Sequence, residues 1–383
     1  MGRVVGIDLG TTYSAVAVLG DDGLPEILKN ADGEPTTPSV VLFQSFDGKD
    51  EPLVGTMAKH SAASDPDNVV QFVKRQMGNP DWRFDSDSGV SYSAEEVSSL
   101  IIKKLLQDAE QALGEEICGA VITVPAYFDD ARRTATKQAG VIAGTKVLRV
   151  LNEPTAAALS FGLDTEKNGV TLVYDLGGGT FDVTLLKIED GCFTVIGTDG
   201  DRNLGGFDFD NALMSFVAEE LSKQGAGNVL EDYLISAELR EKCEMVKRTL
   251  SNVPKANLHI SKDGKPYRVA ISREDFQRAS RSLLSRTQEL VEDVLEDTGY
   301  SWAQIDHVVL VGGSTRMPMV HKLIEDISGM KPELGVNPDE AVAMGAAVQA
   351  AIEMESSIDV TGASENSLPD MPLFTVPNVV IAD

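Results

Sequence analysis

One strand–turn–strand pattern occurs twice in the sequence, and it limits the chain to a fold built from two similar halves. Residues 4–19 and 172–188 each contain an apolar strand, the triplet Asp-Leu-Gly and a second strand. The aspartates of the two copies, Asp8 and Asp175, lie 167 positions apart in a chain of 383 residues. A further apolar strand covers 307–311, and a helix-like pattern follows it, as in α/β folds. We therefore predict an α/β protein with two lobes of one plan.

Glycine-rich loops follow three of the apolar strands, at residues 10–12, 177–180 and 312–314. One such loop is most often only a turn. Three of them at strand ends favour phosphate binding, because a residue without Cβ lets a phosphate approach the backbone N–H groups. The sequence contains no G-x-x-x-x-G-K-[ST], which excludes a P-loop NTPase, and no G-x-G-x-x-G opens the first helix, so a dinucleotide fold is unsupported.

The chain is strongly acidic, with 33 Lys and Arg against 60 Asp and Glu and a net charge of −27. Such a surface repels nucleic acid and anionic lipid, so we expect neither nucleic acid nor membrane as a partner. The three cysteines, Cys118, Cys192 and Cys243, are widely spaced, which excludes a disulfide scaffold and suits a reducing compartment. No apolar stretch reaches the roughly 18 residues of a membrane span. We therefore predict a cytoplasmic protein.

Two carboxylates end buried strands directly before phosphate-binding loops. Asp8 and Asp175 are costly there without a partner, and Mg²⁺ held through water is the natural one, although an Asx turn would also explain them. Asp182 alternates onto the same strand face as Thr180.

Each of the other candidate residues has two possible interpretations. Lys74 is either a solvated lysine or a phosphate ligand, and Glu153, which precedes a proline at a helix start, is either a helix cap or a catalytic group. Four residues of a helix predicted over about 237–251 share one face, which is either an exposed salt-bridged stripe or a binding surface: Glu244, Lys247, Arg248 and Ser251. Capping boxes at Ser93 and Ser272 predict two further helices, the second continuing past Val294.

Several segments resemble the signatures of the DnaK-type (seventy-kilodalton heat-shock) chaperones, and the resemblance extends over about residues 3 to 352. The matching segments are 6–14, 123–128, 152–157, 173–182, 309–318 and 337–343. The resemblance implies an actin-like ATPase fold, in which two lobes with duplicated ribonuclease-H-like cores flank a nucleotide cleft. It also implies slow Mg²⁺-dependent hydrolysis of ATP to ADP, with K⁺ in the site.

Domain limits follow from the same resemblance. Lobe I would cover 1–165, with an abridged outer subdomain at about 30–110, and lobe II would cover 166–352, with an outer subdomain at about 205–285. Residues 353–383 would form a tail that resembles the family's interdomain linker.

The resemblance also implies roles for single residues. Asp8 and Asp175 would hold the hydrated metal, and Pro125 and Arg133 would couple nucleotide state to a peptide-binding domain. The catalytic residues would be Lys74, Glu153, Thr180 and Asp182. The residues that bind ATP would be Gly10, Thr11, Thr12, Tyr13, Lys74, Gly177, Gly178, Gly179, Thr180, Glu244, Lys247, Arg248, Ser251, Gly312, Gly313, Ser314, Arg316 and Asp339.

The implied partners are a J-domain cochaperone, a nucleotide exchange factor, and unfolded client proteins reached through a peptide-binding domain that this chain does not include. The sequence departs from the family pattern at three places: the segment between Lys74 and Pro125 is shorter than usual, and Arg202 and Phe207 are unusual residues. Two other functions of the same superfamily stay open, a small-molecule kinase and an actin-like filament ATPase.

Overall fold

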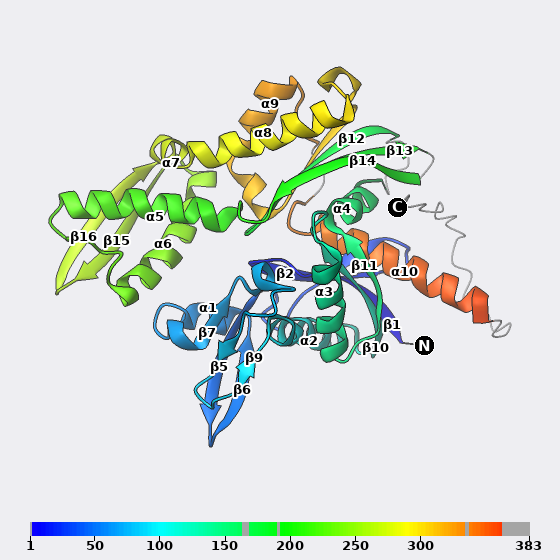
Figure 1. Cartoon of the computed structure of the whole chain (residues 1–383), viewed down its shortest axis with the longest axis horizontal. Helices are drawn as coiled ribbons and strands as arrows, with labels where there is room; N and C mark the ends of the chain where they lie inside the picture. The colour runs from blue at the N-terminus through cyan, green and yellow to red at the C-terminus, as the bar shows by residue number, and fades with distance from the viewer. Residues whose placement is uncertain (1, 163–167, 190–191, 334–336, 362–383) are drawn as a thin grey trace.

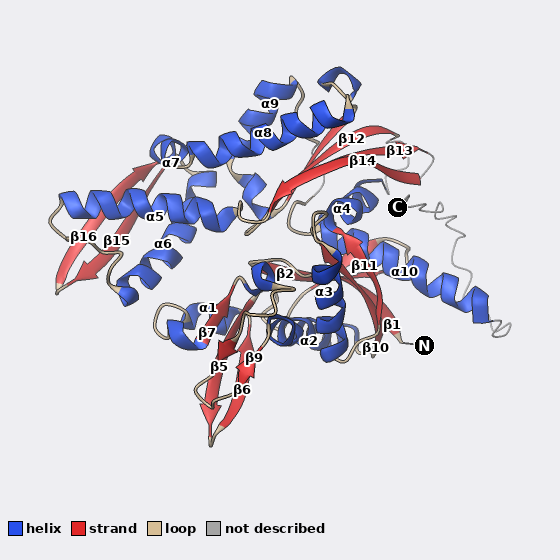
Figure 2. Cartoon of the chain, in the orientation of Figure 1, coloured by secondary structure: helices blue, strands red, loops and turns tan. Residues whose placement is uncertain are grey.

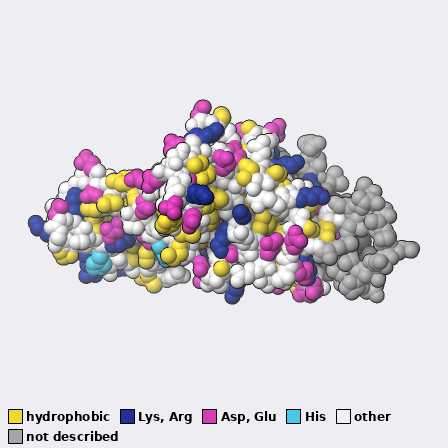
Figure 3. Space-filling view, turned by 90° about the horizontal axis from the view of Figure 1, so that it is seen from below, with side chains coloured by type: hydrophobic (Ala, Val, Ile, Leu, Met, Phe, Trp, Pro, Cys, Tyr) yellow, Lys and Arg dark blue, Asp and Glu magenta, His cyan; other side chains and the backbone are white. Residues whose placement is uncertain are grey.

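The chain forms two lobes, one built around each copy of the repeated strand–turn–strand pattern (Figure 1). A computed structural model describes residues 2–162, 168–189, 192–333 and 337–361. No helix among these residues is both long enough and apolar enough to cross a lipid bilayer. In Figure 3, acidic side chains lie at many separate places on the coloured part of the visible face, in keeping with the net charge of −27.

The core of lobe I is a six-stranded sheet in which parallel and antiparallel strands are mixed. Its order is β11-β10-β1-β2-β3, with β4 paired to β2; β1 and β10 are parallel, as are β10 and β11. The bounds are β1 Arg3–Asp8, β2 Tyr13–Leu19, β3 Pro25–Leu28, β4 Thr37–Pro38, β10 Ile117–Val124 and β11 Val147–Asn152. Helices α2 (Ala94–Leu113) and α3 (Asp130–Ile142) cover the face that carries Val5 and Ile7.

The core of lobe II is a four-stranded sheet of order β14-β13-β12-β17. Its strands are β12 Gly169–Leu176, β13 Phe181–Glu189, β14 Cys192–Asp201 and β17 His307–Val311. Helices α8 (Arg281–Thr298) and α9 (Pro318–Ser328) pack with its apolar residues into one cluster. The predicted helix after Ser272 is wrong in one respect, because it divides into α7 (Arg273–Ala279) and α8, with Ser280 between them.

Helices α4 (Glu153–Gly162) and α10 (Ala341–Thr361) lie between the two core sheets, where alanines and small apolar residues form a shared cluster (Figures 1 and 2). A Cβ on Gly345 would lie 1.7 Å from the Ala156 carbonyl oxygen. The two helices can therefore approach this closely only because residue 345 has no side chain. Helix α10 continues to Thr361, which corrects the predicted start of the tail at residue 353. The rest of that tail, including 379–383, lies outside the described residues.

Each lobe also has an outer part beside the cleft. In lobe I it contains small sheets and short helices: β5 Val40–Phe46, β6 Lys49–Val54, β7 Val69–Gln71, β8 Phe84–Asp85, β9 Ser91–Tyr92, α1 Thr56–Ser61, η1 Pro66–Asn68 and η2 Val73–Gln76. Helix α2, which falls within the predicted outer range of 30–110, packs on the core sheet instead. In lobe II the outer part contains α5 Gly206–Lys223, α6 Tyr233–Asn252, β15 Lys255–Lys262, β16 Lys265–Ser272 and α7. Two short helices complete lobe II, η3 Trp302–Gln304 and η4 Gly313–Arg316.

Candidate functional site

A cleft of about 880 Å³ lies between the two lobes and is lined by both of them. Most of the predicted nucleotide ligands line it: Asp8, Gly10, Thr11, Thr12, Tyr13, Lys74, Glu153, Asp175, Gly177, Gly178, Thr180, Glu244, Lys247, Arg248, Ser251, Gly312, Gly313, Ser314, Arg316 and Asp339. Gly179 and Asp182 lie directly behind this lining, next to Thr180 in the same loop and strand. The structure thus gathers residues from seven separate stretches of sequence around one cavity.

The two Asp-Leu-Gly turns meet tip to tip at the floor of the cleft. A Cβ on Gly178 would lie 1.9 Å from Thr12 Oγ1, and a Cβ on Gly179 would lie 2.3 Å from Thr11 Cγ2. The threonines of lobe I therefore occupy the space that side chains would need in the lobe II loop. Glycine is required at these positions for close approach between the lobes.

Strand register places three carboxylates at the same floor. Asp8 pairs with Ala15 in the first hairpin, and Asp175 pairs with Asp182 in the second. Asp182 is 1% exposed, and neither of its carboxylate oxygens has a hydrogen-bond partner in the described structure. The Thr123 hydroxyl donates to Asp8 over 3.3 Å.

Burial and mutual repulsion make these carboxylates hard to ionise together. Burial, with the nearby charge of Glu153, raises the pKa of Asp8 to about 7, although Lys74 opposes the shift. The pKa values of Asp175 and Asp182 are raised by burial first and by Glu153 second. A cation in the cleft would relieve this repulsion.

The donor set fits magnesium held mainly through water. Carboxylate oxygens are the hard ligands that Mg²⁺ prefers, and this ion usually keeps several waters and bridges to phosphate oxygens. Among the described residues there is no group of three or more His, Cys, Asp and Glu side chains that could hold a metal directly. Asp8 and Asp175 would therefore hold the ion from one side, and ligand and water would complete it.

Lys74 lies at the cleft floor and is buried, so the interpretation as a solvated surface lysine is wrong. Its side chain is 6% exposed and pairs with Glu153 over 2.5 Å. Burial by itself lowers the pKa of Lys74, but the negative charges of Glu153 and Asp8 outweigh it and raise the pKa. Glu153 is also the first residue of α4, so it begins the helix and lines the site at the same time.

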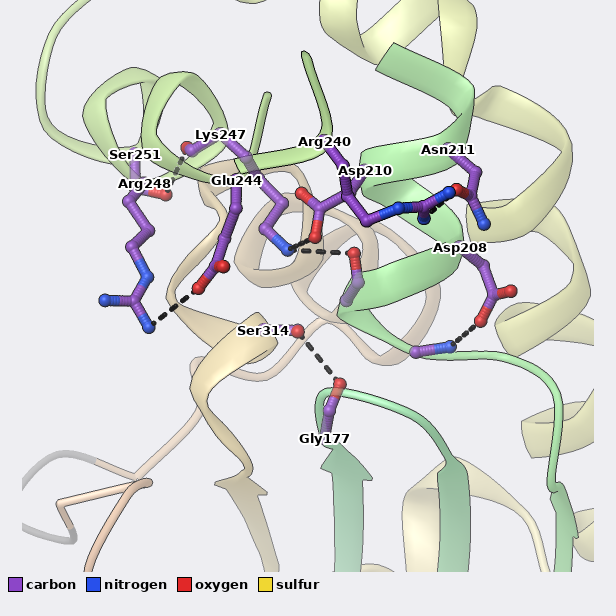
Figure 4. A network of polar contacts seen from close by, with 12 residues as sticks. Gly177, Asp208, Asp210, Asn211, Arg240, Glu244, Lys247, Arg248, Ser251 and Ser314 are labelled. Atoms are coloured by element: carbon purple, nitrogen blue, oxygen red, sulfur yellow. Dashed lines mark hydrogen bonds and ion pairs between the residues drawn. The ribbon is translucent and has the colours of Figure 1, made fainter. Parts of the chain in front are cut away.

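The phosphate loop of lobe II is held through its carbonyl oxygens. The Gly206 and Phe207 N–H groups, at the start of α5, donate to Gly177 and Gly178 over 2.9 and 2.7 Å. The Ser314 hydroxyl also donates to the Gly177 carbonyl, over 2.9 Å (Figure 4). These bonds turn the carbonyls toward the protein, which leaves backbone N–H groups for an anion.

Arg75 also binds this loop, and sequence reasoning missed it. It donates to the Gly179 carbonyl from Nε and Nη2, over 3.1 and 2.7 Å, and pairs with Asp208 over 2.6 Å. Its position directly after Lys74 was the available signal, but no pattern in the sequence connects it with a residue of lobe II.

The predicted stripe on α6 lines the cleft, although Arg248 is 58% exposed and also pairs with Glu244 over 3.2 Å (Figure 4). Glu244 pairs with Lys59 of lobe I over 2.6 Å, and this pairing outweighs burial and lowers the pKa of Glu244. Arg248 lies 4.8 Å above the ring of Tyr13, also from lobe I. Lys247 is held inside lobe II, where it donates to Asp210 over 2.9 Å and to the Gly206 carbonyl.

At another part of the site, η4 contacts the turn that directly precedes α10. Arg316 donates to Asp339 over 2.6 Å and to Asn337 over 2.8 Å. A Cβ on Gly313 would lie 2.7 Å from an oxygen of Asp339, so glycine lets this aspartate close over the turn. Ser251 lines the same cavity from α6.

Pro125, in the loop that follows β10, and Arg133, in α3, are not among the residues that line the cleft. Arg133 donates to the carbonyls of Phe128 and Ala126 and to the Asn152 side chain, over 2.7 Å for the latter. It therefore ties this loop to the end of β11, directly before Glu153. The coupling role of both residues stays a prediction.

A family model described as Hsp70 protein matches residues 4–89 and 81–364 of this sequence. The match covers most of the chain, so the chain belongs to the Hsp70 family. The two-lobed α/β architecture is the actin-like ATPase fold of that family. Hsp70 proteins are chaperone ATPases that bind ATP, ADP and Mg²⁺ and act with J-domain proteins, nucleotide exchange factors and clients.

Proposed function

We propose that this member of the Hsp70 family is the ATPase domain of a DnaK-type chaperone, which binds ATP and hydrolyses it slowly in the presence of Mg²⁺. Its nucleotide state would control a peptide-binding domain outside the chain, and its partners would be a J-domain cochaperone and an exchange factor. A cytoplasmic location belongs to the same proposal, supported by the family's usual compartment and by the widely spaced cysteines.

The observation that carries the proposal is the meeting of the two phosphate loops beside buried charges. Thr11 and Thr12 interlock with Gly178 and Gly179, and Asp8, Asp175 and Lys74 surround the junction. A polyphosphate bound there would take main-chain N–H groups from both loops, as in other phosphate-binding nests.

The chain's residues divide into three groups by the task that each group supports. Asp8 and Asp175 would hold the hydrated magnesium, which neutralises phosphate charge when bound. Lys74, oriented by Glu153, would place one positive charge against the γ-phosphate, and positioning with charge neutralisation supplies most of the rate in phosphoryl transfer. Glu244, Arg248, Ser251, Arg316 and Asp339 would hold the nucleoside between α6 and η4.

Potassium completes the proposal. Asp182 is buried with two unpartnered oxygens, which are suitable ligands for a monovalent cation next to Thr180. Burial first, and repulsion from Glu153 and Asp175 second, raise the pKa of Asp182, and such an ion would offset both.

The test is calorimetric titration of ATP with and without Mg²⁺, on the parent and on Asp8→Asn and Asp175→Asn. We expect the parent to bind ATP more tightly with Mg²⁺ and both variants to lose most of this difference, together with Mg²⁺-dependent hydrolysis. Apo stability should be equal or higher in the variants, because each substitution removes a carboxylate that burial and the neighbouring Glu153 make costly to ionise. Asp47→Asn, at an exposed turn between β5 and β6, is the matched control. Hydrolysis at the parental rate in either cleft variant would contradict the metal assignment.

A further inference from the structure

Arg75 is a lobe I side chain that reaches across the cleft and donates hydrogen bonds to the phosphate loop of lobe II. It lies in η2 of lobe I, and its side chain is 16% exposed. The guanidinium binds the Gly179 carbonyl with two N–H groups and Asp208 with one of them. The same carboxylate oxygen of Asp208 accepts the Gly205 N–H over 2.9 Å, at the start of α5 (Figure 4).

The three carbonyls of this loop are fixed from different lobes. Groups of lobe II itself bind the carbonyls of Gly177 and Gly178, whereas Arg75 of lobe I binds the carbonyl of Gly179. A peptide group is planar, so the direction of the Gly179 carbonyl also sets the direction of the Thr180 N–H. Orientation of this last donor therefore depends on the position of lobe I.

An aromatic contact across the cleft supports the same guanidinium. The ring centroids of Phe72, in lobe I, and Phe207, in lobe II, lie 4.3 Å apart. Arg75 and Arg240 lie over the Phe207 ring at 5.0 and 4.8 Å. Phe72 has φ of 60°, an uncommon conformation for a bulky residue, and its ring reaches Phe207 from there.

We propose that Arg75 is a positioning residue that couples closure of the two lobes to the orientation of the Gly179–Thr180 peptide. When the lobes separate, Arg75 leaves Gly179 and Asp208, and this peptide loses the contact that fixes it. When they close, the Thr180 N–H is aimed at the cleft. The inference rests on the proposed ATPase function and adds the link between domain closure and the phosphate loop.

Such a link predicts a larger effect on hydrolysis than on binding. A donor that is oriented toward charge developing on the γ-phosphate lowers the barrier, whereas ground-state binding uses many other contacts. We expect Arg75→Ala to bind Mg-ATP with a dissociation constant within threefold of the parent and to slow single-turnover hydrolysis by about tenfold or more. Arg75→Lys should recover only part of the rate, because an ammonium cannot reproduce the forked contact with a carbonyl and a carboxylate.

Arg240→Ala is the matched control for the stacking contact. Arg240 lies over the same Phe207 ring, but it donates to Asn211 and makes no contact with Gly179. This variant should hydrolyse ATP at a rate within threefold of the parent. An equal loss of rate in Arg75→Ala and Arg240→Ala would overturn the inference, since general support of closure would explain both.

Hydrogen–deuterium exchange gives a readout that does not need hydrolysis. With the non-hydrolysable analogue AMPPNP and Mg²⁺ bound, peptides that contain Thr180 should exchange faster in Arg75→Ala than in the parent. In Arg240→Ala the same peptides should exchange at the parental rate. Parental exchange together with parental hydrolysis in Arg75→Ala would overturn the proposal. A parent that fails to hydrolyse ATP would overturn the proposed function instead, and the exchange comparison would still decide the role of Arg75.

Discussion

The two copies of the strand–turn–strand pattern have the same backbone plan and opposite side-chain chemistry. Lobe I carries Thr11 and Thr12 where lobe II carries Gly178 and Gly179, and the threonines fill the space that the glycines leave. In the paired strands, Asp8 faces Ala15, whereas Asp175 faces a second acid. The repeat therefore produces two complementary halves, and neither half forms the site by itself.

The loops of the two copies also differ in how they are held. In lobe I the Ser39 hydroxyl donates to the Gly10 carbonyl over 2.8 Å, and the Ser39 N–H donates to Thr12 over 2.9 Å, so this loop is fixed within its own lobe. In lobe II the Gly179 carbonyl is bound by Arg75 from the other lobe. The lobe II loop is therefore the one whose geometry depends on closure of the cleft.

The largest expected effect comes from removing Lys74, the lobe I side chain whose positive charge lies among the carboxylates at the floor of the cleft. Lys74→Ala leaves Glu153 buried without its partner, so we expect hydrolysis to fall roughly a hundredfold or more while ATP affinity changes by a few fold. The free energy of unfolding should fall by about 3 kcal/mol, as when one partner of a buried ion pair is lost. Single-turnover assays and denaturant unfolding measure the two effects.

A double variant separates charge balance from catalysis. Lys74→Met with Glu153→Gln removes both charges, so stability should recover while hydrolysis stays slow. Single-turnover rates of Lys74→Ala within twofold of the parent would remove Lys74 from the chemistry and leave Asp8 as the proposed contribution of lobe I.

The next effect tests the fit between threonine and glycine. Gly178→Ala places a Cβ 2.7 Å from Thr12 Cβ, an atom that cannot rotate away, so the lobes should be forced apart. Overpacking of this kind costs roughly 1–3 kcal/mol, and we expect ATP affinity to fall by about tenfold to a hundredfold in calorimetry. In Gly177→Ala the new Cβ would lie 3.6 Å from its nearest neighbour, and the loss should be much smaller. Equal affinities of the two variants would show that the loops do not interlock.

A smaller effect concerns the proposed nucleoside end of the cleft, where lobe I contributes the Tyr13 ring and lobe II contributes Arg248. Arg248→Ala should lower the affinities for ATP and ADP together, by about tenfold, or roughly 1.4 kcal/mol. Pyrophosphate, which lacks the nucleoside, should bind as before. Arg278→Ala, which removes an exposed arginine paired with Asp275, is the control. A change for ATP without a change for ADP would place Arg248 at the γ-phosphate instead.

The smallest effect contrasts the outer parts of the lobes. The outer parts of both lobes contain buried apolar residues, but in lobe I a carboxylate also ties the hairpins together. Asp50 accepts hydrogen bonds from Ser45, Ser86, Ser88 and Tyr92. Burial acts to raise the pKa of Asp50, but these hydroxyl donors outweigh it and lower the pKa to about 2. The stabilisation is therefore fully present above the unfolded pKa near 4 and is lost as pH falls toward 2.

Asp50→Asn should accordingly lower the free energy of unfolding by about 1 kcal/mol at pH 7, a modest value because the site is partly open to solvent. The difference between variant and parent should shrink between pH 4 and pH 2.5. Urea titrations at both ends of this range measure it, and a difference that does not change with pH would assign it to packing rather than to the charge.

The sequence by itself determined the two-lobed plan, the glycine-rich loops at the strand ends and the helix starts. Alternation and apolar runs specify strands locally, and the capping boxes at Ser93 and Ser272 begin α2 and α7 as predicted. The repeat of Asp8 and Asp175 could be predicted because identical local patterns fold in identical ways. The resemblance to a known family then assigned the candidate ligands residue by residue.

Tertiary structure decided which of the open interpretations hold. Lys74 has the local pattern of a solvated lysine, and only the approach of α4 brings Glu153 to it and buries both. The contact of Arg75 with Gly179 joins residues 104 positions apart in different lobes. Hydrogen bonds and ion pairs of this kind depend on distances in space, which the spacing of residues along the chain does not encode, and therefore they had to be seen in the folded protein.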